Sequence, residues 1–268
     1  MKTNPLQFAL IQAIASAGAN AHMRQAGVKV ARKGTGKDTV TIVDGENERN
    51  IKRELRKVDP RISFIGEETR KLKGTGTTLV VVDPLDATTN FGLGRKEFTV
   101  MGQIFEDGKP TFAVISVPVF GELLIAKKDH GVIRRTKAGD ERIQISEPAS
   151  LAEAVISCNR SNYPDEASMQ LGLRIIEMLM RNARSWRNFG TAGYEYTEVA
   201  RGRLDGVVTP IAEAVHAAGH FMMQEAGATV TDEQGRPWAL DSRMIVAAHP
   251  RIHDALLRGV EQAIKQPE

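Results

Sequence analysis

The sequence predicts a layered α/β protein, with an α+β first half followed by an α/β second half. Between residues 98 and 146, short apolar runs alternate with turn signals such as Asp107-Gly108, which is typical of antiparallel hairpins. After about Pro148, strands alternate with helical patterns of roughly 10–15 residues, which indicates a mixed or parallel sheet. We therefore expect two halves, residues 1–147 and 148–268.

The elements expected in the first half follow from hydrophobic periodicity and from stop signals at glycine, proline and aspartate. Helices are expected at residues 5–26 and 46–58, and strands at 39–43, 62–65, 79–82, 98–105, 111–118, 123–126, 132–135 and 142–145. The run 79–82 is apolar at every position, which is typical of a strand buried on both faces. The polar segment 70–78 contains two glycines and is expected to be a mobile loop.

The second half repeats strand and helix in turn. Strands are expected at residues 154–158, 186–189, 205–209, 229–231 and 244–247, and helices at 165–180, 191–201, 213–226 and 250–265. Pro250 marks the start of the last helix, because proline is favoured in the first turn. We find no repeat, linker or low-complexity segment that would separate the halves further.

The composition excludes several classes of protein. Lys and Arg number 36 against 33 Asp and Glu, and a net charge of +3 over 268 residues predicts no nucleic-acid partner. Aromatic residues make up 5%, too few for base-stacking surfaces. The single cysteine, Cys158, excludes an internal disulfide and favours the cytoplasm. Polar residues interrupt the apolar run 6–21, so we expect no membrane segment and no export signal.

Acidic residues gather where predicted strands end. Asp44 follows one strand, Glu67 and Glu68 follow the next, and Asp83 and Asp86 end the most apolar strand of the chain. Because anions at buried strand ends repel one another, a cation must hold them together. A set of oxygen ligands favours Mg²⁺ over Zn²⁺.

The segment that contains Asp83 and Asp86 has further features of a phosphate site. Pro84 stiffens the turn, and the carbonyl of Leu85 can point the same way as the two carboxylates. The following residues begin a helix or tight turn, whose free backbone N–H groups form a seat for phosphate. The Thr88 hydroxyl can hold or polarise a water. A metal, a water and an anion seat together indicate a phosphate-ester hydrolase.

These residues resemble the signatures of the inositol monophosphatase family, within the fructose-bisphosphatase-like superfamily. The family signature Asp-Pro-Ile/Leu-Asp-Gly-Thr-x-Asn-Phe reads here Asp83-Pro84-Leu85-Asp86-Ala87-Thr88-Thr89-Asn90-Phe91. Further segments match in the family's order at residues 38–44, 64–68, 189–192, 199–206, 217–220 and 225–227. The likeness covers residues 6–260, nearly the whole chain.

The resemblance implies an α/β/α/β/α sandwich with the site between its halves. It implies a Mg²⁺-dependent phosphomonoesterase that acts on a small phosphorylated metabolite (an inositol, sugar or nucleotide phosphate), and it implies a homodimer. The implied Mg²⁺ ligands are Glu67, Asp83, the Leu85 carbonyl and Asp86. The implied catalytic residues are Asp44 and Thr88, which position the attacking water, together with Glu67. The implied substrate contacts are the N–H groups of Ala87 and Thr88, and the segment Gly190, Thr191 and Ala192.

Two departures from the family pattern bear on activity. Ala87 stands where the family has glycine, which keeps the N–H group but adds a methyl. Val215 stands where the family has the aspartate that binds the second metal, and valine cannot bind a cation. Glu213 is an alternative ligand nearby. Because a weakened second metal site slows hydrolysis, the alternative function is a degenerate family member that binds a phosphorylated ligand or a protein partner, or that catalyses a modified tailoring reaction.

The remaining polar motifs are interpreted without a catalytic role. The glycine-bearing segment 34–38 lacks the pattern of a nucleotide-binding loop, although Lys37 can balance charge near the metal site. The i,i+4 histidine pairs lack the glutamate of a zinc motif. Structural roles are expected for His216 and His220, and solvent exposure for His249 and His253.

Overall fold

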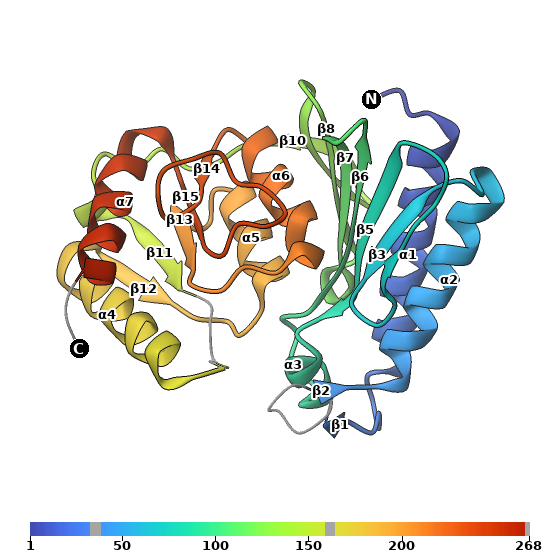
Figure 1. The fold of residues 1–268 in the computed structure, drawn as a ribbon, viewed down its shortest axis with the longest axis horizontal. Helices are drawn as coiled ribbons and strands as arrows, with labels where there is room; N and C mark the ends of the chain where they lie inside the picture. Colours follow the sequence, from blue (N-terminus) through green and yellow to red (C-terminus); the bar gives the residue numbers. More distant parts are fainter. Residues whose placement is uncertain (33–38, 159–163, 266–268) are drawn as a thin grey trace.

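The structure is a computed structural model that describes residues 1–32, 39–158 and 164–265, and these form a mixed α/β fold (Figure 1). The helices are α1 (Pro5–Arg24), α2 (Ile42–Val58), α3 (Thr88–Gly92), α4 (Glu166–Asn182), α5 (Ala192–Ala200), α6 (Ala217–Glu225) and α7 (Pro250–Lys265). The 3-10 turns are η1 (Pro118–Phe120), η2 (Leu151–Glu153) and η3 (Ala214–His216). The strands are β1 (Ala31–Arg32), β2 (Thr39–Val40), β3 (Ser63–Gly66), β4 (Arg70–Leu72), β5 (Thr78–Asp86), β6 (Thr99–Glu106), β7 (Lys109–Val117), β8 (Glu122–Lys127), β9 (Gly131–Thr136), β10 (Gly139–Ile143), β11 (Val155–Cys158), β12 (Ser185–Arg187), β13 (Gly206–Thr209), β14 (Thr229–Thr231) and β15 (Ile245–Ala248).

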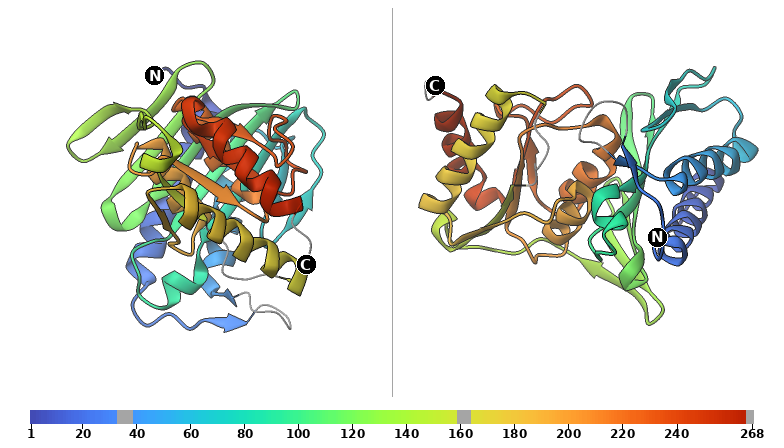
Figure 2. Two further views of the ribbon diagram at one scale, coloured as in Figure 1. Left: turned by 90° about the vertical axis from the view of Figure 1, so that its left-hand side faces the viewer. Right: turned by 90° about the horizontal axis from the view of Figure 1, so that it is seen from below.

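Five layers follow one another across the molecule (Figures 1 and 2). Helices α1 and α2 cover one face of an eight-stranded sheet, and α5 and α6 cover the other. The same two helices also pack on a five-stranded sheet, whose far face is covered by α4 and α7. This arrangement confirms the α/β/α/β/α sandwich that the family resemblance implies.

The eight-stranded sheet has the order β10-β9-β8-β7-β6-β5-β3-β4 and is antiparallel except where β3 runs parallel to β5. Alternate residues of β5 enter different cores. Val80 and Val82 pack with α1 and α2, whereas Val81 packs on the opposite face with Ala217 of α6. Because both faces are covered, residues 79–82 of this strand are all apolar, as the sequence predicted.

The five-stranded sheet has the order β12-β11-β13-β15-β14. Its first three strands are parallel, and β15 pairs antiparallel with both of its neighbours. Val207 of β13 faces the layer of α5 and α6, and Val208 faces α4 and α7. The strand–helix alternation of the second half therefore forms a mixed sheet buried on both faces.

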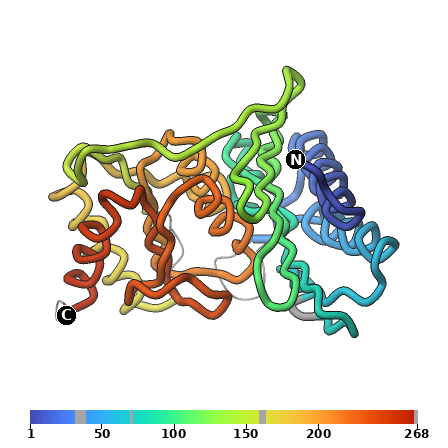
Figure 3. Tube along the Cα trace, turned by 90° about the horizontal axis from the view of Figure 1, so that it is seen from above, coloured from blue at the N-terminus to red at the C-terminus, as the bar shows by residue number. Residues whose placement is uncertain are grey.

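The chain passes from one sheet to the other between Ile143 and Val155, along the upper edge of the molecule in Figure 3. Residue 147, near which the sequence predicts a boundary, belongs to this crossing segment, and the division into two halves stays a prediction. Since α5 and α6 pack on both sheets, apolar contacts continue from one half to the other. None of the described helices combines the length and the hydropathy of a membrane span.

Two sequence predictions in the first half are wrong. Helix α2 begins at Ile42, where a strand through residue 43 was expected, because Thr41 and Asp44 form a capping box that ends β2 early. Residues Arg70–Leu72 form β4, which pairs antiparallel with β3, where a mobile loop was expected. A helix cap in the first case and strand pairing in the second thus produced a structure that composition did not predict.

Candidate functional site

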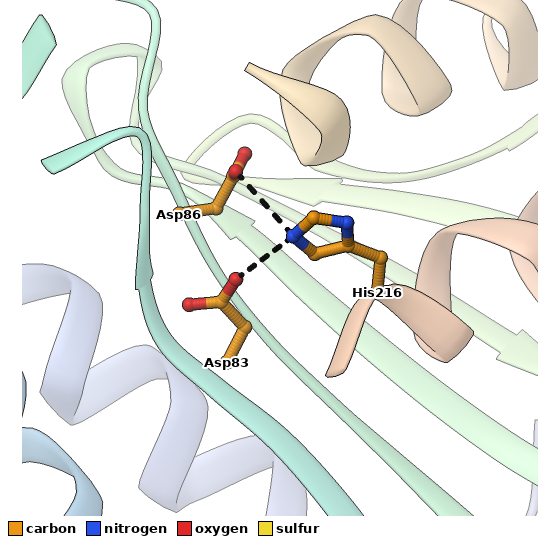
Figure 4. A group of neighbouring side chains, drawn as sticks. All are labelled: Asp83, Asp86 and His216. Atoms are coloured by element: carbon orange, nitrogen blue, oxygen red, sulfur yellow. Dashed lines mark ion pairs between the residues drawn. The ribbon is translucent and has the colours of Figure 1, made fainter. Parts of the chain in front are cut away.

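Asp83 and Asp86 lie at the end of β5, and both side chains point toward His216 (Figure 4). In a regular strand, side chains three positions apart point to opposite faces. Here the pairing of β5 with β6 shifts register between Asp83 and Asp86, which brings both carboxylates to one side. The N–H of Leu85 donates to Asp83 Oδ1 at 3.0 Å and closes the turn. Both aspartates are buried.

Asp86 is held by donors from the second half of the chain. Its Oδ2 accepts hydrogen bonds from the Thr191 hydroxyl at 2.5 Å, the Gly193 N–H at 2.8 Å and the Thr99 hydroxyl at 3.3 Å. A Cβ at Gly193 would lie 2.1 Å from Thr99 Oγ1, so only glycine allows this close approach. The N-terminus of α5 is therefore docked on Asp86, while Asp86 Oδ1 faces His216.

His216 reaches both carboxylates from η3. Its Nε2 lies 3.4 Å from Asp83 Oδ2 and 3.9 Å from Asp86 Oδ1 (Figure 4). Burial lowers the pKa of His216, but contact with Asp83 and the charges of Glu213 and Asp86 outweigh this effect and raise that pKa to about 9. Burial likewise raises the pKa of Asp83 to about 6, against the lowering effect of His216. Asp83, Asp86 and His216 form the first cluster.

The second cluster consists of Asp44, Glu67 and Glu68, whose carboxylate oxygens lie within 4.8 Å of one another. Asp44 is fully buried in the first turn of α2, and not at the end of a strand as expected. Its Oδ2 accepts from the Thr41 N–H at 2.9 Å, and its Oδ1 accepts from the Thr88 hydroxyl at 2.9 Å. Burial raises the pKa of Asp44, although these hydrogen bonds partly oppose the shift.

The two clusters are neighbours at one edge of the large sheet. Gly66 pairs with Val82 in the parallel strands β3 and β5, so Glu67 and Asp83 directly follow a paired position. The Thr88 hydroxyl lies within hydrogen-bond distance of both Asp44 Oδ1 and, at 3.2 Å, the Leu85 carbonyl. The predicted ligands are thus divided between the clusters, with Glu67 in the second, and Asp83 and Asp86 in the first.

Ala87 adopts the left-handed conformation that glycine would favour, with φ 67° and ψ 51°. The sequence raised the question of whether the extra methyl changes φ at this position. The structure keeps the positive φ, and this conformation costs an L-residue with a side chain roughly 1–2 kcal/mol of conformational free energy.

We expect Ala87→Gly to raise the free energy of unfolding by about 1 kcal/mol, because glycine removes the left-handed strain and loses only part of that gain in chain entropy. Urea unfolding followed by circular dichroism measures the change. Ala138→Gly is the matched control at an exposed turn position whose φ is not positive, and it should lower stability slightly. A loss of stability in Ala87→Gly would contradict the strain assigned to Ala87.

The segment Gly190, Thr191 and Ala192 lies beside the first cluster. The Asn90 side chain donates to the Phe189 carbonyl at 2.8 Å and thereby joins the signature turn to this segment. Gly190 has φ 70°, and its N–H donates to Asn188 Oδ1. The Thr191 hydroxyl is engaged by Asp86, so this side chain positions a carboxylate.

The sequence predicted a structural role for His216, and the structure places its ring against Asp83 and Asp86. The sequence signal for this position is that His216 directly follows Val215, where the family pattern has a metal-binding aspartate, and directly precedes Ala217, where α6 begins. Its neighbour His220 is buried against Trp238 at 3.8 Å between ring centroids, as expected of a structural residue.

Two further sequence predictions concern residues outside the clusters. His253 is buried, and its Nε2 lies 3.0 Å from Thr231 Oγ1, so the exposure predicted for it is wrong. Segment 34–38, with Lys37, lies outside the described residues.

The donor chemistry of both clusters fits divalent cations. Asp83 and Asp86 place two carboxylates close together in a buried position, where like charges repel strongly. Burial raises the pKa of Asp83, and the charge of Asp86 adds to this effect. The second cluster offers oxygen atoms only, which suits a hard ion such as Mg²⁺. A bound cation would offset the repulsion in each cluster.

Comparison with known proteins identifies related chains of nearly the same length. The profile of the inositol monophosphatase family matches residues 3–265. An inositol-1-monophosphatase of Rhizobium meliloti is 31% identical over 271 residues, which cover 98% of this chain and 99% of that protein. A Pasteurella multocida protein named Nus factor SuhB is 30% identical over 97% of both chains. The solved inositol monophosphatase of Thermotoga maritima has a TM-score of 0.87 at 30% identity, covering 98% of this chain and 99% of that one.

Proposed function

The chain belongs to the inositol monophosphatase family, and on that premise we propose that it is a Mg²⁺-dependent phosphomonoesterase acting on a small phosphorylated alcohol. The observation that carries the proposal is the position of the Thr88 hydroxyl, which lies within hydrogen-bond distance of groups at both clusters. This hydroxyl connects Asp44 of the second cluster with the Leu85 carbonyl beside the first. Acidic groups from three stretches of the chain thereby meet at one sheet edge.

In the proposed site, Glu67 of the second cluster, Asp83 and Asp86 of the first cluster and the Leu85 carbonyl supply the metal ligands. When bound, divalent cations supply charge neutralisation at the phosphoryl group and lower the pKa of a bound water. The support for these ligands is the burial of Asp83 and Asp86 and the divided but adjacent clusters. The hydrogen bonds on Asp86 Oδ2 hold that carboxylate in one orientation.

Asp44 and Thr88 are proposed to position the attacking water. When Thr88 donates its single hydroxyl proton to Asp44, its oxygen keeps lone pairs that accept a hydrogen bond from water. The raised pKa of Asp44 makes this carboxylate a better proton acceptor than an exposed aspartate. Together the two side chains can orient the water and receive its proton.

The substrate is proposed to lie between the signature turn and the segment 190–192. The N–H groups of Ala87 and Thr88 stand at the start of α3, where no intrahelical acceptor is available, and they would bind the phosphate. Gly190, Thr191 and Ala192 would border the alcohol part of the substrate. Inositol, sugar and nucleotide phosphates all carry a phosphate group that is esterified to an alcohol.

A second candidate function is binding of a phosphorylated ligand or a protein partner without rapid hydrolysis. The observation that favours it is Val215, an apolar residue where a carboxylate is expected, followed by His216 against Asp83 and Asp86. Some relatives of the chain are named Nus factor SuhB and not phosphatase. Altered activity, or a modified reaction on an unusual metabolite, is part of this candidate.

A phosphate-release screen tests the proposal. We expect the purified protein to release inorganic phosphate from at least one member of a panel of inositol, sugar and nucleotide phosphates when Mg²⁺ is varied, and to stop when EDTA removes the metal. If no substrate is hydrolysed and calorimetry still detects binding of a panel member, the second candidate is favoured instead.

The oligomeric state, the compartment and the partners of the protein are further expectations. A homodimer in the cytoplasm stays a prediction of the family resemblance and of the single cysteine. The absence of a nucleic-acid partner also stays a prediction from the net charge of +3.

A further inference from the structure

We infer that His216 is a metal ligand, and that the first cluster therefore selects a transition ion such as Zn²⁺ over Mg²⁺. The inference rests on the proposed function, since it concerns one metal position of the same site. It departs from the family pattern, in which an aspartate stands at the position of Val215 and all metal ligands are oxygen atoms.

One distance in the first cluster matches that between two ligands of one ion, and the others are close to it. His216 Nε2 lies 3.4 Å from Asp83 Oδ2 and 3.9 Å from Asp86 Oδ1 (Figure 4). Charge-assisted N–H···O bonds are shorter, at about 2.7–2.9 Å. Ligands at about 2.0–2.2 Å from a common ion, at angles between square and tetrahedral, lie roughly 3.0–3.5 Å apart. The three donor atoms all fall within 4.8 Å of one another, so a small movement closes them on an ion.

The surroundings of His216 aim Nε2 at the carboxylates. Its ring packs edge-to-face on Tyr196, with centroids 6.4 Å apart. Tyr196 is itself fully buried, and its hydroxyl lies 3.0 Å from Thr209 Oγ1. His216 Nδ1 is buried and has no hydrogen-bond partner among the described residues. The orientation of the imidazole therefore depends on its packing against Tyr196.

No described carboxylate from η3 takes the third position. Val215 is buried and apolar, and Glu213, at the start of η3, is exposed. Among the described residues, the group with mutually close ligand atoms contains His216 and not Glu213. The side chain that joins Asp83 and Asp86 is therefore an imidazole.

An imidazole changes which ion is preferred. Nitrogen ligands suit Zn²⁺ and other first-row transition ions, whereas Mg²⁺ favours oxygen and dehydrates reluctantly. The second cluster has only carboxylates and keeps the preference for a hard ion. The chain thus carries two neighbouring clusters with different metal preferences.

Nuclear magnetic resonance of the histidine rings tests ligation directly. Full-length protein labelled with ¹⁵N-histidine is titrated with Zn²⁺ and, separately, with Mg²⁺, and the His216 signal is assigned by its loss in His216→Gln. We expect the Nε2 resonance of His216 to move on addition of Zn²⁺ and to stay unchanged with Mg²⁺. This measurement uses the wild-type protein and is independent of turnover.

Calorimetry measures the selectivity. We expect His216→Asp to lower the ratio of Zn²⁺ to Mg²⁺ affinity at least about tenfold, because it restores oxygen ligands throughout. His130→Gln, which changes an exposed histidine of the β8–β9 turn, should leave the ratio unchanged. Thermal unfolding checks that each variant folds, and His216→Gln replaces His216→Asp if the latter does not.

The outcomes separate the inference from the proposed function. A His216 resonance that ignores Zn²⁺, or an unchanged affinity ratio in a folded variant, overturns the inference even if phosphate is released. A shifted resonance together with a lowered ratio supports it, even if no substrate in the panel is hydrolysed. In the latter case only the proposed hydrolysis fails.

Discussion

Asp83→Asn should reduce metal-dependent phosphate release about a thousandfold or more while the protein stays folded. The carboxylate is buried at the end of β5 and belongs to the first cluster. Replacing this carboxylate with an amide removes the charge of a metal ligand. A metal ion stabilises a phosphoryl-transfer transition state by several kcal/mol, and each ~1.4 kcal/mol corresponds to a tenfold change in rate. Initial rates on the best substrate of the panel, measured across a range of Mg²⁺ concentrations, give the effect.

The fold is expected to survive this substitution because the asparagine oxygen can still accept the Leu85 N–H. In metal-free buffer the thermal midpoint should stay close to that of the wild type. Asp241→Asn is the matched control, since Asp241 is exposed in the loop between β14 and β15. Normal turnover by folded Asp83→Asn protein would remove Asp83 from the proposed ligand set.

Thr88→Val should lower kcat by roughly a hundredfold to a thousandfold and leave KM nearly unchanged. Valine keeps the size of the side chain but lacks the hydroxyl that bonds Asp44 at 2.9 Å. If the hydroxyl positions the water, its loss removes proton-transfer assistance, which is typically worth a factor of about 10²–10⁴. Steady-state kinetics at saturating Mg²⁺ separate kcat from KM.

The neighbouring threonine provides the control for Thr88→Val. Thr89 is exposed, and its hydroxyl lies 3.0 Å from Thr39 Oγ1, away from Asp44. Thr89→Val should therefore keep kcat within about twofold of the wild type, as expected for a surface substitution. Equal losses in both variants would show that the turn tolerates no change, and the water-positioning role of Thr88 would then lose its support.

The errors of sequence reasoning share one cause. Asp44 was expected at the end of a strand, but the capping box of Thr41 and Asp44 begins a helix there. His253 was expected to be exposed, but α7 turns it onto Thr231 of β14. Both residues depend on contacts that hydrophobic periodicity does not describe, whereas the long apolar run of β5 was predicted with its burial.

What the sequence determined by itself is the layered α/β fold and the acidic residues that the structure brings together in two neighbouring clusters. Periodicity reports which face of an element is buried, and the contiguous signature from Asp83 to Phe91 keeps its residues together in any fold. Only the tertiary structure decided how those acids are grouped and which distant side chain joins them. His216 lies 130 residues after Asp86, and it meets the aspartates because α5 and α6 are packed between two sheets, a long-range contact that no local pattern encodes.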